Sequence, residues 1–177
     1  MTIKKANFYK IFQDEGAPFY IDEYNIDENH FNHWVSENFK EIASINDFKE
    51  IVPSRKTIDK FTIAGYVHRP YQCHYSAKAI SILDSDYEYW TGFVHRQDNI
   101  NYPIITHSFN IFKGTIVDFS RLNQDFSIYT NEDLYLPHVY YGINIPSGFV
   151  EEYRESVFNQ YSMKPLLFEW YRKIKIK

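Results

Sequence analysis

The sequence predicts an α+β fold in which a helix packs on an antiparallel sheet. A stretch over 27–43 repeats its apolar residues at helical spacing behind Asp27, a suitable cap, and a second apolar-faced helix begins at Cys73. Downstream, two β-rich segments are joined by the turn Lys113-Gly114, as in a hairpin. The apolar positions of the first helix are Phe31, Trp34, Val35, Phe39 and Ile42.

The chain has no internal repeat and no Gly/Ser linker, so we expect one domain over 1–177. Its 177 residues are enough to bury a core without disulfides or a structural metal. Within that domain we expect a mostly helical N-terminal scaffold (1–58), a core that carries the candidate catalytic residues (59–150), and a closing helix and tail (146–177).

Charge and composition limit the classes of function. The net charge of -4 argues against non-specific nucleic-acid binding, which needs a strongly basic surface. No segment has the apolar region of a signal peptide or the roughly 20 apolar residues of a membrane span. A single cysteine also excludes an internal disulfide. We therefore expect a soluble, cytoplasmic protein with no nucleic-acid or membrane partner.

The elements before the cysteine are predicted from local patterns. Residues 1–26 lack a clear period and indicate irregular or short extended pieces, with a turn at 15–18. The Asn and Asp at 46–47 are suited to cap a short second helix that ends before Pro53. The segment 60–66 is β-rich and predicts a short strand.

The elements after the cysteine are one helix and several strands. The helix that begins at Cys73 is expected to end near 84–86, where Asp-Ser-Asp follows its last apolar residue. A strand over 87–96, a polar loop and a strand over 103–112 come next. The hairpin turn then leads to a third strand over 115–120.

One histidine and one aspartate lie in this hairpin. His107 is near the middle of the first arm and Asp118 near the end of the second. Antiparallel pairing places His107 opposite about residue 118 or 119, and opposed residues point to the same face with Cβ atoms about 5 Å apart. The hairpin alone therefore predicts that the Asp118 carboxylate lies beside the His107 ring.

Cys73 has the features of a nucleophile. A lone intracellular cysteine with a histidine and an acid elsewhere in the chain is a candidate for thiol catalysis. The unpaired N–H groups and the dipole at a helix N-terminus stabilise an anion, so a thiolate there has a lowered pKa. With the helix docked on the hairpin, Cys73, His107 and Asp118 would form a catalytic triad.

These residues also carry a family resemblance. The block HSFNIFKGTIVD, from His107 to Asp118, resembles the papain-like and transglutaminase-like pattern of His, an aromatic residue and Asn, a turn with Gly, and Asp on the next strand. CHYSA at a helix start and YYGINIP before a later helix are similar to small bacterial and phage members of that superfamily. The likeness covers roughly residues 60–150. It implies a papain-like core, with the nucleophile helix packed on an antiparallel sheet that carries His and Asp.

The sequence departs from that pattern in places. Phe109 stands where Trp is common, and Phe119 follows the Asp where Pro is common. Gln72 directly precedes the cysteine, whereas the family's oxyanion Gln lies several residues earlier. Asn110 matches the pattern, but three residues from His107 it faces the other side of an ideal strand, which favours a structural hydrogen bond. Gln72 and Asn110 are therefore secondary candidates.

The resemblance implies a cysteine-dependent hydrolase or acyltransferase that cleaves an amide, isopeptide or thioester through an acyl-enzyme, without a cofactor. Its substrate would be an amide- or acyl-bearing protein, peptide or small molecule. A lone cysteine on an apolar helix face is most often a small buried hydrophobe, so a noncatalytic binding or inhibitory module is the alternative. A zinc site would gather the triad residues with His68 or His74, but no close-spaced Cys or His pair supports one.

The other histidines are interpreted as solvated or packing residues. His74 follows the cysteine on the helix and is expected to point away from it. His30 and His33 lie on the exposed side of the first helix, and His138 follows a proline in a predicted loop.

Overall fold

The structure, a computed structural model, describes residues 3–16, 19–131 and 135–176 and is a mixed α+β fold. Its five strands form one antiparallel sheet in the order β1-β5-β2-β3-β4. The strands are β1 (Lys40–Ile45), β2 (Tyr87–Arg96), β3 (Ile104–Phe112), β4 (Thr115–Val117) and β5 (His138–Ile145). The helices of the described residues are α1 (Phe8–Glu15), α2 (Glu28–Asn38), α3 (Arg55–Ile63), α4 (Cys73–Leu83), α5 (Ser147–Glu151), α6 (Arg154–Gln160) and α7 (Leu167–Ile176).

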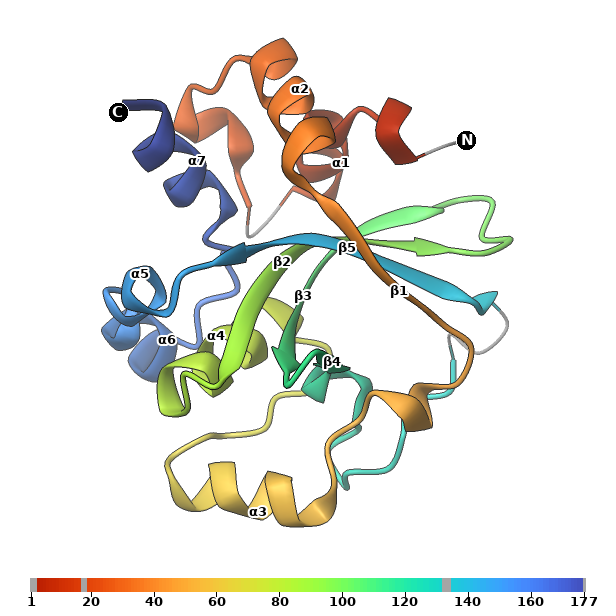
Figure 1. Cartoon of the computed structure of the whole chain (residues 1–177), viewed down its shortest axis with the longest axis vertical. Helices are drawn as coiled ribbons and strands as arrows, with labels where there is room; N and C mark the ends of the chain where they lie inside the picture. The colour runs from red at the N-terminus through yellow and green to blue at the C-terminus, as the bar shows by residue number, and fades with distance from the viewer. Residues whose placement is uncertain (1–2, 17–18, 132–134, 177) are drawn as a thin grey trace.

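The helices cover the curled sheet in groups (Figure 1). α1, α2 and α7 gather near the chain termini around a cluster of aromatic side chains that includes Phe12, Phe31 and Phe168. α4 packs against β2 and β3, with α5 and α6 beside it. α3 lies at the far end of the molecule. No helix in these described ranges has the length and apolar character needed to cross a membrane.

The helix at Cys73 and the two long strands after it confirm their sequence predictions. α4 begins at Cys73 and ends at Leu83, next to the predicted stop. β2 spans the predicted strand, and β3 begins one residue late. The third strand, expected over 115–120, is shorter: β4 ends at Val117, because the Asp118 side chain accepts the Ser120 N–H and starts a 3₁₀ turn. The turn at Lys113-Gly114 has positive φ at both residues, 50° and 80°, as a tight two-residue hairpin connection requires.

Two predictions for the first 66 residues are wrong. The segment 60–66 is not a strand: α3 covers most of it, because the Ser54 side chain accepts the Thr57 N–H at 3.2 Å and caps a helix that buries Ile58 and Phe61 on one face. The expected irregular stretch over 1–26 contains α1, which Asn7 caps through the Lys10 N–H, and the 3₁₀ turn η2 (Ile21–Tyr24). Part of the predicted turn, Ala17 and Pro18, lies outside the described residues.

The predicted helix over 27–43 is also too long. α2 ends at Asn38, and Phe39 adopts extended backbone angles that lead directly into β1. β1 pairs with β5, and Ile42 packs beside a cluster of buried side chains instead of on the helix. Periodicity continued past the true helix end because the strand's apolar residues happened to match it. The predicted short element before Pro53 is the 3₁₀ turn η3 (Phe48–Glu50), capped by Asp47.

Two glycines set the curvature of the sheet at its centre. Gly92 on β2 lies directly opposite His107 on β3 and Gly142 on β5. A Cβ added to Gly92 would lie 2.2 Å from the Tyr141 carbonyl oxygen and 2.6 Å from the Gly142 Cα. The two backbones can approach this closely only without a side chain, so this glycine pair permits the bend.

Substituting Gly92 tests this constraint. We expect Gly92→Ala to lower the free energy of unfolding by about 1–3 kcal/mol or more, because the clash is with backbone that cannot move aside easily. Gly148→Ala is the matched control: nothing lies within 4 Å of its added Cβ, and in α5 alanine is the better helix former. Urea denaturation followed by circular dichroism measures both. Equal stability of the two variants would contradict the proposed role of Gly92.

Candidate functional site

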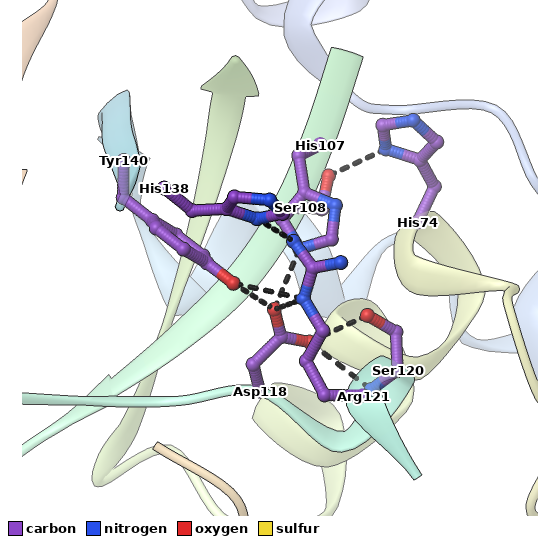
Figure 2. A network of polar contacts seen from close by, with 8 residues as sticks. All are labelled: His74, His107, Ser108, Asp118, Ser120, Arg121, His138 and Tyr140. Carbon is purple, nitrogen blue, oxygen red and sulfur yellow. Dashed lines mark hydrogen bonds and ion pairs between the residues drawn. The ribbon is translucent and has the colours of Figure 1, made fainter. Parts of the chain in front are cut away.

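A buried ion pair joins the histidine and the aspartate of the hairpin. The His107 Nε2 lies 2.6 Å from the Asp118 Oδ2, and both side chains are buried (Figure 2). The structure therefore brings these two predicted residues together.

The register of the hairpin differs from the predicted one. β4 pairs with β3 from Phe112↔Thr115 to Asn110↔Val117 and then ends. Continuing that register places Asp118 opposite Phe109, two residues along β3 from His107 and on the same face. The contact is therefore diagonal rather than direct. The two-residue turn shifts the pairing, and Asp118 reaches the ring because it leaves the ladder as the cap of the 3₁₀ turn η4 (Phe119–Arg121).

Several donors converge on the Asp118 carboxylate. Its Oδ1 accepts the Ser120 N–H at 3.0 Å and the Ser120 hydroxyl at 2.5 Å. Its Oδ2 accepts the Tyr140 hydroxyl at 2.7 Å and lies 3.4 Å from the Arg121 Nε. Burial opposes ionisation of this carboxyl, but His107, Arg121 and Ser120 outweigh it and hold the pKa of Asp118 well below its usual range.

Arg121 and Tyr140 form a second layer that sequence reasoning missed. The Arg121 Nε donates to the Tyr140 hydroxyl at 3.1 Å, and its guanidinium lies 4.7 Å from the centre of the Phe48 ring. Its Nη2 lies 3.2 Å from the His138 Nδ1. Burial, and then the positive charge of Arg121, lower the pKa of His138 to about 3, so the imidazole is neutral and its Nδ1 accepts the hydrogen bond.

The expectation that His138 lies in a loop is wrong, because it is the first residue of β5. A sequence signal existed for part of this layer. Residues 138 and 140 are two positions apart, so in a strand both side chains lie on one face. Arg121 follows Asp118 by three residues, close enough in the chain for an ion pair.

Cys73 is the first residue of α4 and is electrostatically coupled to two histidines. Burial would raise the pKa of its thiol, but the charges and hydrogen bonds of His74 and His107 outweigh burial and lower that pKa well below 9. Conversely, burial would lower the pKa of His107, yet the charges of Asp118 and Cys73 raise it to about 9. A thiolate–imidazolium pair is the form these shifts favour at neutral pH.

We infer that the thiol lies at the edge of β3 that β4 leaves unpaired. His107 belongs to the sheet face that carries Phe109 and Tyr140. His74 bonds Ser108, whose side chain points to the opposite face. A thiol that interacts with rings from both faces must sit at the strand edge, and β4 leaves that edge uncovered because it pairs only as far as Asn110.

The expectation that His74 points away from the thiol is wrong. His74 is buried, and its Nδ1 lies 2.6 Å from the Ser108 Oγ. Every residue of α4 from Cys73 to Ser81 is buried, so consecutive residues there both face protein. A helical-wheel argument misses this, because it assumes that one side of a helix faces solvent.

The two secondary candidates are held by other contacts. The Asn110 Nδ2 donates to the Ala77 carbonyl at 2.9 Å and to the Glu88 carbonyl at 3.3 Å. It lies on the α4 side of the sheet, away from His107, and it fixes α4 on β3, in line with the predicted structural role. The Gln72 Oε1 accepts the Arg69 Nε–H at 2.9 Å, and the Gln72 side chain does not cap α4.

The remaining histidines do not join the triad. His68 is buried, with its Nδ1 2.9 Å from the Tyr66 hydroxyl and its Nε2 2.9 Å from the Leu122 carbonyl. His30 and His33 are exposed on α2, as predicted, each near a carboxylate. Within the described ranges, no group of three or more His, Cys, Asp or Glu residues is placed to hold a metal ion.

Comparison with known proteins gives no match: no family model, curated protein or solved structure matches this chain. Only the geometry of the site therefore indicates what the protein does.

The chain contains its own control for the aspartate, because the tripeptide Asp-Phe-Ser occurs at 118–120 and again at 125–127. Both aspartates accept the N–H and the hydroxyl of the following serine, but Asp125 is in an exposed turn. We expect Asp118→Asn to cost about 3–5 kcal/mol of folding free energy, because it leaves buried cations unpaired. Asp125→Asn should cost far less, because solvent screens the exposed Asp125 carboxylate. Chemical denaturation at pH 7 measures both, and similar losses would show that only the local turn matters.

The thiol and the ring also predict a pH profile of stability. Because the folded pKa of Cys73 is lowered, its contribution is complete above about 8.5 and is lost as pH falls through the folded value. Because the folded pKa of His107 is raised to about 9, its contribution is complete below about 6.5 and is lost as pH rises through about 9. The pair should therefore stabilise the fold most between about pH 6.5 and 8.5.

Replacing Cys73 by Ala should remove the loss of stability at acid pH that comes from the thiol. It should keep a smaller alkaline decline, because Asp118 still raises the pKa of His107 after the contribution of Cys73 is lost. The measurement is the difference in unfolding free energy between wild type and Cys73→Ala from pH 4 to 10. A difference that does not vary with pH would show that the thiol is not ionised in the folded protein.

Proposed function

We propose that this protein is a cysteine-dependent hydrolase or acyltransferase that forms an acyl-enzyme at Cys73, with His107 and Asp118 completing a triad. The observation that carries the proposal is the buried 2.6 Å contact between His107 and Asp118, with the same ring coupled to a thiol at a helix N-terminus. An ordinary core cysteine has no reason to lie against an imidazole oriented by a buried carboxylate.

The arrangement is also the one that the resemblance to papain-like and transglutaminase-like enzymes implies. In such a core the nucleophile helix packs on an antiparallel sheet, and α4 packs in this way on β2 and β3. We propose that residues 59–150 correspond to that core, with the elements around α1, α2 and α7 added to it.

The chemistry begins with proton transfer from the thiol to His107. Because the His107 Nε2 is engaged with Asp118, Nδ1 is the ring nitrogen available to the sulfur. The Cys73 thiolate attacks an acyl carbon and a C–S bond forms, while the carbonyl π electrons move to oxygen. When the tetrahedral intermediate collapses, the bond to the leaving group breaks, and His107 gives its proton to the leaving amine or thiol.

The oxyanion of that intermediate needs hydrogen-bond donors. The first N–H groups of a helix have no acceptor within the helix, and the Gln72 side chain does not cap those of α4. The Cys73 N–H is therefore the main-chain donor suited to this role, where loss of one donor typically costs about 10²- to 10³-fold in rate. Attack on the thioester by water gives hydrolysis, and attack by an amine gives acyl transfer, with His107 as base.

The first test is the pH dependence of Cys73 alkylation by iodoacetamide. Because Cys73 is the only cysteine, the mass gained by the protein reports this thiol alone. We expect the rate to be high already near pH 6 in the wild type and to fall by at least tenfold there in His107→Ala, because the thiolate loses its partner. Circular dichroism establishes that both proteins are folded.

The control for that experiment is His33→Ala, which removes an exposed histidine paired with Glu37 and should not change the rate. A rate that rises only above about pH 8.5 and ignores His107 would identify Cys73 as structural and support the noncatalytic alternative. With a reactive thiol established, thioester and amide substrates can be screened. Cys73→Ser should then abolish turnover without altering the fold.

A further inference from the structure

We propose that His74 is a second cation at the nucleophile, held as an imidazolium by Glu15, Thr106 and Ser108, and that it stabilises the anions formed at Cys73. The proposal rests on the function proposed above. It gives His74 the role of an additional catalytic residue next to the thiol, and makes Glu15 and Thr106 its positioning residues.

The His74 ring is fixed between two hydroxyl groups of β3. Its Nδ1 lies 2.6 Å from the Ser108 Oγ, and its Nε2 lies 3.4 Å from the Thr106 Oγ1 (Figure 2 shows the first contact). The Phe19 ring meets it edge to face, with 5.3 Å between ring centres. His74 is only 2 % exposed, so these hydroxyls, rather than solvent, decide which of its nitrogens carry protons.

Thr106 presents a lone pair to His74. Its N–H donates to the Glu15 Oε1 at 2.8 Å, and its hydroxyl donates to the Glu15 Oε2 in a short hydrogen bond. Burial raises the pKa of Glu15, and the two hydrogen bonds from Thr106 and the neighbouring His74 oppose that rise. An ionised Glu15 carboxylate can only accept, so the Thr106 proton is committed to it. The Thr106 oxygen is then an acceptor for His74, which requires a proton on Nε2.

Ser108 imposes the same requirement on the other nitrogen. Its hydroxyl donates to the Thr91 Oγ1 at 2.9 Å, so it accepts at the His74 Nδ1. With both ring nitrogens acting as donors, His74 is in the imidazolium form. The open edge of β3 makes this possible, because the Thr106 N–H has no strand partner there and is free to bind the carboxylate from α1.

The positive charge of His74 lies close enough to Cys73 to stabilise its thiolate. Together with His107, His74 lowers the pKa of the Cys73 thiol against the effect of burial. Its Nε2 contact with Thr106 is long, so this proton can also be donated to the thiolate or to the oxyanion that develops beside it. The ionisable groups that interact with His74 are Glu15 from α1 and Cys73 on its own helix, whereas His107 acts on the same thiol from the other face of the sheet.

The test compares iodoacetamide alkylation of Cys73 across pH in four proteins: wild type, His74→Gln, His107→Ala and the double variant. We expect His74→Gln to raise the apparent thiol pKa by at least about one unit, a tenfold loss of rate at pH 6. The double variant should reach the ordinary value of about 8.5. A His74→Gln profile equal to wild type, with His107→Ala strongly shifted, would overturn this proposal and leave the triad intact. An ordinary pKa already in the wild type would overturn both.

Glu15→Gln tests the same idea without touching the thiol's neighbours. The amide N–H₂ would donate to the Thr106 Oγ1, so the hydroxyl would turn its proton toward the His74 Nε2, and His74 would become neutral. The thiol pKa should rise as in His74→Gln. Glu37→Gln, beside the exposed His33, is the control and should change nothing.

The ring ¹⁵N shifts of His74, assigned by comparison with His74→Gln, report its protonation directly and do not depend on activity. At pH 7 we expect two protonated nitrogens in the wild type and one in Glu15→Gln. A single protonated nitrogen in the wild type would overturn the proposal even if alkylation changed.

Discussion

The constraint on which the rest of the structure depends is the burial of the Asp118 carboxylate. A charge removed from water costs several kcal/mol unless cations and donors replace its hydration. Here they come from three elements: His107 from β3, Tyr140 from β5, and Ser120 with Arg121 from η4. The Asp118 N–H is also bonded, to the Ile51 carbonyl, which ties the segment after η3 to the site. Satisfying one anion thus fixes the relative placement of strands and turns that are distant in sequence.

The tripeptide Asp-Phe-Ser occurs in two environments, and comparing them separates local contacts from tertiary contacts at Asp118. Around Asp118 and Asp125 the local turn is alike, with the serine two residues on donating twice to the carboxylate. Only Asp118 is covered by β5 and the guanidinium of Arg121. The local sequence therefore forms the same turn in both places. The pKa of the carboxyl is strongly lowered only at Asp118, where the sheet covers it.

Sequence reasoning reached the parts of the site that depend on local order. The start of α4 at Cys73 follows from a helical period, and the contact of His107 with Asp118 follows from a hairpin, although its register was misplaced. The contacts that sequence reasoning missed depend on the order of the strands in the sheet and on which elements cover each face of the sheet. Tyr140 reaches Asp118 because β5 neighbours β2 rather than β4, and Glu15 reaches Thr106 because α1 docks on an open strand edge. In the N-terminal third, apolar spacing alone could not distinguish the end of α2 from the start of β1.

Glu15 and Thr106 are separated by 91 positions, and Cys73 lies between them in the chain. The electrostatic environment of the sulfur is therefore assembled from both sides of its own sequence position. A growing polypeptide that has exposed Cys73 but not yet β3 holds a commonplace thiol, slow to react with oxidants or electrophiles. If Cys73 acts as proposed, its reactivity arises only when folding is complete, and the thiol stays unreactive while the unfolded chain leaves it exposed to solvent.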